Sequence, residues 1–91
     1  MYKEESLKYL ITVIPFDPAS TYEDFGWEVK RFGQTFQISP YHWVVTTSWH
    51  SDEMCSKLKH CIDDMDSVFI CAFEHWNHIN FPETTIDKLS N

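Results

Sequence analysis

The sequence predicts a small two-layer α+β domain, because two stretches with the pattern strand, helix, strand follow each other along the chain. The chain has 91 residues, of which 43% are hydrophobic and 16% are aromatic, with only two glycines. This composition fits one domain with its own core and excludes a disordered or collagen-like chain. No apolar run approaches the ~20 residues of a membrane-spanning helix. We therefore expect one domain over residues 1–91 that does not cross a membrane.

The first unit begins with the run YLITVIPF at Tyr9–Phe16, which is apolar on both faces of a strand and has a proline near its end. Ser20–Glu23 has the spacing of a capping box. Apolar residues then follow at helical spacing, namely Tyr22, Phe25, Val29 and Phe32. Gly33 is a natural helix stop, so we expect a helix over about 21–32. The alternation in Thr35–Ser39 predicts a half-buried edge strand.

The second unit begins with the run WVVTTSW at Trp43–Trp49, which is again apolar on both faces. Ser51 is expected at the N-cap of a second helix, with acidic residues in its first turn. Its apolar face is predicted to consist of Met54, Cys55, Leu58, Cys61 and Ile62. This helix is expected to end near Asp63–Asp64, and a fourth strand is expected over Ser67–Phe73.

The order of these elements favours a ferredoxin-like βαββαβ sandwich, a four-stranded antiparallel sheet with two helices on one face. The core of the domain is expected over about 8–76. Residues 77–91 form a tail, in which Ile79–Phe81 is compatible with a short extra strand. The helices cover only one face of the sheet, so Trp43, Trp49 and one alternating set of side chains in Tyr9–Phe16 are expected to need a cover on the other. We therefore predict a two-fold homodimer packed sheet to sheet.

Charge and cysteine content limit the partners and the compartment. The net charge is −7 and the isoelectric point is near 5.0, which disfavours binding to a phosphate backbone without a local patch or a metal. The acidic residues have two interpretations, ordinary solubility or imitation of phosphates at a site on another protein; they include Asp52, Glu53, Asp63, Asp64 and Asp66. Three cysteines without a C-x-x-C pair, and a start without a secretory pattern, predict reduced thiols in a cytoplasmic protein.

Short motifs resemble a known family. Lys30–Gly33 (KRFG), Gln37-x-Ser39 and an aspartate just after the first strand, Asp17, resemble the small CRISPR-associated nuclease-like subunit of spacer acquisition. The segment Ser39–Ala72 is similar to short stand-alone relatives of that subunit, and the resemblance covers about 8–76. It implies a ferredoxin-like homodimer that cleaves phosphodiester bonds with a metal ion or holds nucleic acid as a scaffold. Related virulence-associated toxins are ribonucleases with the same fold.

Asp17 is the candidate catalytic and metal-binding residue. One Asp17 from each chain of a dimer would share a Mg²⁺ or Mn²⁺ ion, which prefers oxygen ligands and polarises a phosphate. The competing interpretation is that Asp17 belongs to a turn that ends the strand. A zinc site at Glu74, His75 and His78 is disfavoured, because these residues follow a strand and lack a third ligand at a typical spacing.

Two functions from different classes follow from the sequence. The first is a nucleic-acid-associated homodimer that acts as a metal-dependent endonuclease on RNA or DNA. The second is a non-enzymatic protein-binding scaffold or an acidic inhibitor of a nucleic-acid-binding protein. A stacking platform for bases at Tyr41, Trp43 and Trp49 is disfavoured, because few cations stand near these aromatic residues in the sequence. The two functions differ in the role of Asp17.

Overall fold

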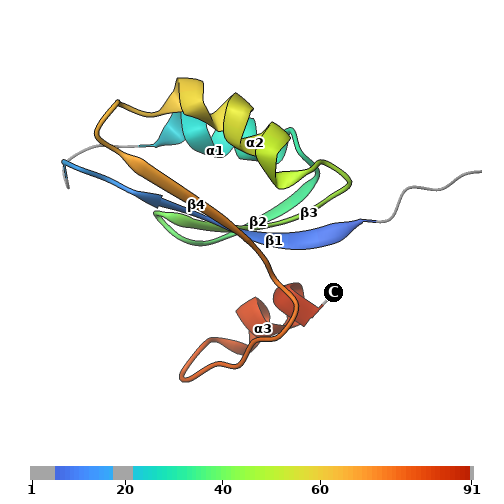
Figure 1. The fold of residues 1–91 in the computed structure, drawn as a ribbon. Coiled ribbons are helices and arrows are strands. Elements are labelled where there is room, and N and C mark those ends of the chain that lie inside the picture. The colour runs from blue at the N-terminus through green and yellow to red at the C-terminus, as the bar shows by residue number, and fades with distance from the viewer. Residues whose placement is uncertain (1–5, 18–21, 91) are drawn as a thin grey trace, which may run out of the picture.

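The strands and helices follow the predicted order, and the C-terminal tail adds a further helix (Figure 1). The computed structural model describes residues 6–17 and 22–90. The strands are β1 (Leu7–Ile14), β2 (Gln34–Ser39), β3 (His42–Thr47) and β4 (Ser67–Ala72). The helices are α1 (Glu23–Lys30), α2 (Ser51–Leu58), the short 3₁₀ helix η1 (Lys59–Cys61) and α3 (Glu83–Ser90). The strands form one antiparallel sheet in the order β2-β3-β1-β4, which confirms the ferredoxin-like α+β fold.

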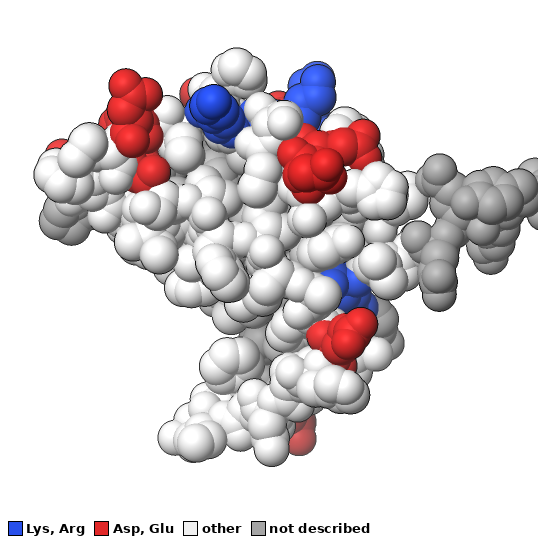
Figure 2. Space-filling view, in the orientation of Figure 1, with Lys and Arg blue, Asp and Glu red and all other residues white. Residues whose placement is uncertain are grey.

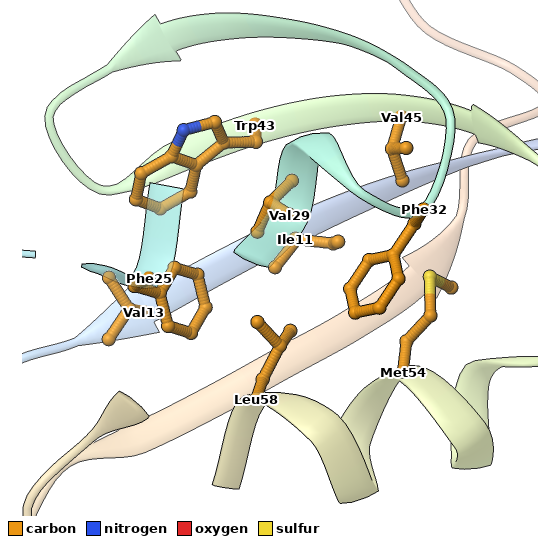
Figure 3. Close-up of a cluster of buried hydrophobic side chains, with 9 residues drawn as sticks. All are labelled: Ile11, Val13, Phe25, Val29, Phe32, Trp43, Val45, Met54 and Leu58. Carbon is orange, nitrogen blue, oxygen red and sulfur yellow. The ribbon is translucent and has the colours of Figure 1, made fainter. Parts of the chain in front are cut away.

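The core lies between the sheet and the layer formed by α1 and α2. Because side chains alternate between the two faces of a strand, the odd-numbered residues of β1 and β3 point toward these helices. Figure 3 shows the nine residues of the core cluster pointing toward one another: Ile11, Val13, Phe25, Val29, Phe32, Trp43, Val45, Met54 and Leu58. The apolar helix face predicted for α1 is therefore confirmed.

The two tryptophans that were expected to need a cover on the other face lie on the helix side instead. Trp43 is 2% exposed, and its ring centroid lies 5.0 Å from that of Phe25. Trp49 packs against Phe32 with centroids 5.0 Å apart. The expectation for these two residues was wrong, because the register of β3 turns its odd-numbered side chains toward α1.

Strands β1 and β3 each end earlier than the apolar runs predicted. Pro15 has no N–H to donate, and the amide of Phe16 donates to Asp66 Oδ1 (2.9 Å) rather than to a neighbouring strand. Strand β3 ends at Thr47, whose Oγ1 accepts a hydrogen bond from the amide of Trp49 (2.9 Å). Side-chain hydrogen bonds thus replace the strand pairing at both ends.

The helix ends also differ from their predicted positions. The predicted cap of the first helix, Ser20, lies outside the described residues. The N-cap of α2 is His50 rather than Ser51, and Glu53 Oε1 accepts a hydrogen bond from the His50 amide (3.2 Å). Cys55 was expected on the apolar face of α2 but is exposed. The buried residues of this helix are Met54 and Leu58.

The tail corrects the expectation of a short extra strand at residues 79–81. Asn80 has a φ of +60°, which interrupts an extended chain. The carbonyl oxygen of Pro82 accepts hydrogen bonds from the amides of Thr85 and Ile86 and thereby starts α3. This helix lies on the side of the sheet opposite α1 and α2 (Figure 1). None of the described helices is long and apolar enough to cross a membrane.

Helix α3 is attached to the sheet at its C-terminal end. Leu89 is 3% exposed, and Lys8 Nζ donates a hydrogen bond to the Leu89 carbonyl oxygen (2.8 Å). The chain itself therefore covers part of the face that motivated the sheet-to-sheet dimer. The homodimer stays a prediction.

Candidate functional site

Asp17 is exposed just beyond the end of β1. In the part of the chain that the structure describes, no three His, Cys, Asp or Glu side chains gather into a group that would hold a metal ion. The catalytic and metal-binding roles of Asp17 therefore stay predictions, as does the use of Mg²⁺ or Mn²⁺. Residue Pro18, on which the alternative turn depends, lies outside the described residues.

The neighbouring carboxylate of Asp66 has a structural role that the sequence did not reveal. Asp66 Oδ1 accepts a hydrogen bond from the Phe16 amide, and Oδ2 accepts one from the Asp63 amide (3.1 Å). The pKa of Asp66 is lowered mainly by the Phe16 amide and further by the Asp63 amide and the Tyr22 hydroxyl, against an opposing effect of desolvation. Asp66 thus joins the loop before β4 to the end of β1.

Asp66→Asn is expected to make the free energy of unfolding fall less steeply as the pH is lowered. A carboxylate whose pKa is lower in the folded than in the unfolded chain stabilises the fold above its unfolded pKa. That contribution is lost as the pH falls below about 4 and through the folded pKa. Urea midpoints measured from pH 7 to pH 2 should fall less steeply for the variant than for the wild type. Asp64→Asn controls for the loss of one charge in the same loop, and equal slopes for Asp66→Asn and the wild type would contradict the role of Asp66.

The three cysteines are free thiols at different degrees of exposure. Cys55 is exposed, whereas Cys61 and Cys71 are half-buried. Burial raises the pKa of Cys61, and the carboxylates of Glu28 and Asp24 raise it further. The thiol of Cys61 is therefore held in its protonated form, which is the unreactive form.

His75 and His78, two of the residues considered for a zinc site, lie in the segment that follows β4. His75 and His78 are exposed, and His78 belongs to a row of rings that follows β4. In this row, Phe73 stacks on Trp76 with centroids 5.9 Å apart and planes 12° apart, and His78 lies 6.4 Å from Phe81. The segment after β4 therefore contributes aromatic surface.

A cavity lies between the sheet and this aromatic segment. Its volume is about 480 Å³. Its lining is mostly apolar and comes from β1, β2, β3 and the tail: Leu10, Ile38, Ser39, His42, Phe73, Trp76, Asn77, Phe81 and Leu89. We refer to this space as the tail cavity. The sequence signal for it is the density of aromatic residues after the last strand, which is higher than a solvated tail requires.

The polar residues of the tail cavity include a linked pair at the β2–β3 hairpin. Ser39 Oγ lies 2.6 Å from His42 Nδ1 and accepts a hydrogen bond from the amide of Tyr41 (3.2 Å). Both Ser39 and His42 are half-buried. The sequence carries no clear signal for this pair, because a serine and a histidine around a Pro-containing turn are common hairpin residues.

A second surface runs along strand β4, which has no neighbouring strand on its outer side in the described part of the chain. Four large apolar side chains lie on this strand, beside it or just before it, and each is more than half exposed: Ile14, Phe16, Met65 and Phe69. The register places Thr12 opposite Phe69 and Ile14 opposite Ser67, so Ile14 and Phe69 share the face opposite α1 and α2. We call the outer edge of β4 and these four side chains the β4 flank.

The β4 flank is uncharged, whereas the helix layer is acidic. Strand β4 reads SVFICA, without a charged residue or a proline. Residues 22–66, which include α1 and α2, hold eight Asp and Glu against four Lys and Arg. Figure 2 shows charged side chains above the sheet and around α3, with an uncharged flank between them. Strand β4 is thus an uncharged stretch of an acidic chain.

Comparisons of the chain with protein-family models, curated proteins and solved structures found no match. The resemblance to the CRISPR-associated subunit therefore stays a prediction.

Proposed function

We propose that the protein is a non-enzymatic homodimer that binds a basic surface of another protein through its acidic helix layers. The observation that carries the proposal is the β4 flank, an uncharged edge strand with exposed apolar neighbours in a chain of net charge −7. An edge strand presents unpaired N–H and C=O groups, and proteins normally protect such edges with charges, prolines or bulges. The β4 edge has none of these protections.

The opposite edge of the sheet is protected, which favours β4 as the site of association. Strand β2 has an irregular register between Gln37 and Ser39. Lys88 of α3 lies over the ring of Phe36, with its Nζ 4.8 Å from the ring centroid. A bulge and a covering helix are two of the ways in which edges are blocked.

Pairing of β4 with β4 of a second copy gives partners to the unpaired N–H and C=O groups of the edge. It does so between two strands that hold no charged residue. A strand pairs antiparallel with an identical strand about a two-fold axis, so the contact is self-complementary. That axis is perpendicular to the sheet, so the α1 and α2 layers of both copies lie on the same side of an eight-stranded sheet. The dimer then presents one continuous acidic face, which suits a basic surface that otherwise binds phosphates.

Phe69→Glu is expected to weaken the dimer at least ~100-fold, because it places a carboxylate from each copy near the two-fold axis. Sedimentation equilibrium at several protein concentrations measures the dissociation constant. Gln34→Glu adds the same charge on the opposite edge strand and should leave the dimer intact. A wild-type chain that stays monomeric at all concentrations, or a Phe69→Glu variant that dimerises like the wild type, would refute the proposed interface.

The acidic face is tested with the wild-type dimer and the Phe69→Glu variant as baits. Basic proteins that bind the dimer should be released by a double-stranded DNA competitor and should bind the variant weakly, because the variant lacks the doubled acidic face. Retention of these proteins by the variant, or no release by DNA, would count against the acidic face as the binding surface.

Nuclease activity is the outcome that would replace this proposal. In the β4-paired dimer the two Asp17 residues lie near opposite ends of the strand pair, roughly 20 Å apart for a six-residue strand. They are then too far apart to share one metal ion. Cleavage of labelled RNA or DNA with Mg²⁺ or Mn²⁺ that is lost with EDTA and in Asp17→Ala would require a different dimer and would make the protein an enzyme.

A further inference from the structure

We propose that the tail cavity binds a small aromatic molecule that carries one hydroxyl group. The site is separate from the β4 flank and from the acidic helix layer, and it is formed within one chain. Its volume of about 480 Å³ falls within the range of small-molecule sites, about 300–1,000 Å³.

The walls of the cavity select a flat apolar body. Three aromatic residues, Phe73, Trp76 and Phe81, belong to the lining, and Phe73 stacks on Trp76. Leu10 and Leu89 line the cavity from β1 and α3. Aromatic rings stack on such walls with a gain beyond that of the buried area alone.

The hairpin pair selects the hydroxyl group. Ser39 Oγ accepts the amide hydrogen of Tyr41 and shares a hydrogen bond with Nδ1 of His42, so this ring nitrogen is already engaged. The other ring nitrogen of His42, Nε2, is left to bond with a ligand. An aromatic hydroxyl group both donates and accepts, so it can bond to this nitrogen in either tautomer, and Asn77 adds a further polar group to the lining.

Helix α3 contributes Leu89 to the lining of the cavity, so occupancy is linked to the docking of the tail. The helix is attached through the hydrogen bond from Lys8 to the Leu89 carbonyl and through Lys88 over Phe36. A ligand that contacts both the sheet and Leu89 binds only the docked arrangement. Binding therefore stabilises the docked tail by mass action.

Naphthalene and 2-naphthol are the probes that test the site, since they differ by one hydroxyl group. Titration followed by ¹H–¹⁵N NMR should give saturable shifts for the amides of Ile38, His42 and Leu89, with tighter binding of 2-naphthol. His42→Phe should weaken 2-naphthol about tenfold, the effect of one hydrogen bond, and leave naphthalene almost unchanged. Ile38→Trp fills the cavity from β2 and should weaken both probes.

The proposal is overturned if neither probe gives saturable shifts, or if the shifts fall on Ile14 and Phe69 instead of the cavity residues. Equal weakening of both probes by His42→Phe would remove the proposed role of the hairpin pair. Ile38→Trp still tests the cavity if the histidine variant does not fold. The monomeric Phe69→Glu variant should bind 2-naphthol as the wild type does, which separates this test from that of the dimer.

Discussion

Gly33→Ala is expected to lower the free energy of unfolding by at least about 2 kcal/mol. Gly33 has a φ of +156°, a conformation that residues with a side chain rarely adopt. A Cβ at this position would overlap the carbonyl oxygen of Thr46. Thr46 cannot move aside, because it is paired with Gln34 of β2 and Lys8 of β1 in the centre of the sheet.

The other glycine of the chain, Gly26, is the matched control. A Cβ on Gly26 would meet the Trp43 side chain at 3.7 Å, an ordinary contact. Because Gly26 lies inside α1, Gly26→Ala should stabilise the fold by about 0.5–1 kcal/mol. Urea unfolding followed by circular dichroism measures both variants. Similar free energies of unfolding for the two alanine variants would show that the backbone conformation at position 33 does not require a glycine.

Much of the fold could be predicted, because the apolar pattern of the chain agrees with its topology. The runs around Ile11 and Val45 are apolar on both faces, and the structure places them in the two central strands. The helical spacing of Phe25 and Val29 likewise identified the buried face of α1. Such patterns are set by burial, which the order of residues along the chain records directly.

Helix α3 could not be predicted, because its sequence has little apolar periodicity. Its eight residues, ETTIDKLS, include only two large apolar side chains, Ile86 and Leu89. A helix this short is marginal on its own and depends on packing for its stability. Here the packing partner is the sheet face some eighty positions earlier in the chain, where Lys8 bonds to the Leu89 carbonyl.

The candidate sites were harder to predict than the fold, because they depend on contacts between distant segments. Nothing near Asp66 in the sequence indicates that its carboxylate accepts the amide of Phe16, fifty positions away. The β4 flank was missed for a related reason. The sequence placed β4 correctly, but the exposure of Phe69 follows from which face α3 covers, and that helix was not expected.

Phe25→Ala is expected to cost about 3–5 kcal/mol of stability, a large fraction of the 5–15 kcal/mol typical of a small domain. Phe25 is fully buried and contacts both Trp43 and the edge of Tyr22, so its removal leaves a cavity between α1 and the sheet. Thermal unfolding should show a fall in Tm of more than ~12 °C.

The control is Trp27, a larger aromatic residue two positions along the same helix. Trp27 is 67% exposed, and its ring contacts Lys30, whose Nζ lies 4.6 Å from the ring centroid. Because residues two positions apart point to nearly opposite sides of a helix, Trp27→Ala should change the stability by less than about 1 kcal/mol. The contrast between the two variants depends on helical periodicity and not on residue size. A loss for Trp27→Ala as large as that for Phe25→Ala would mean that Trp27 is buried in the protein in solution.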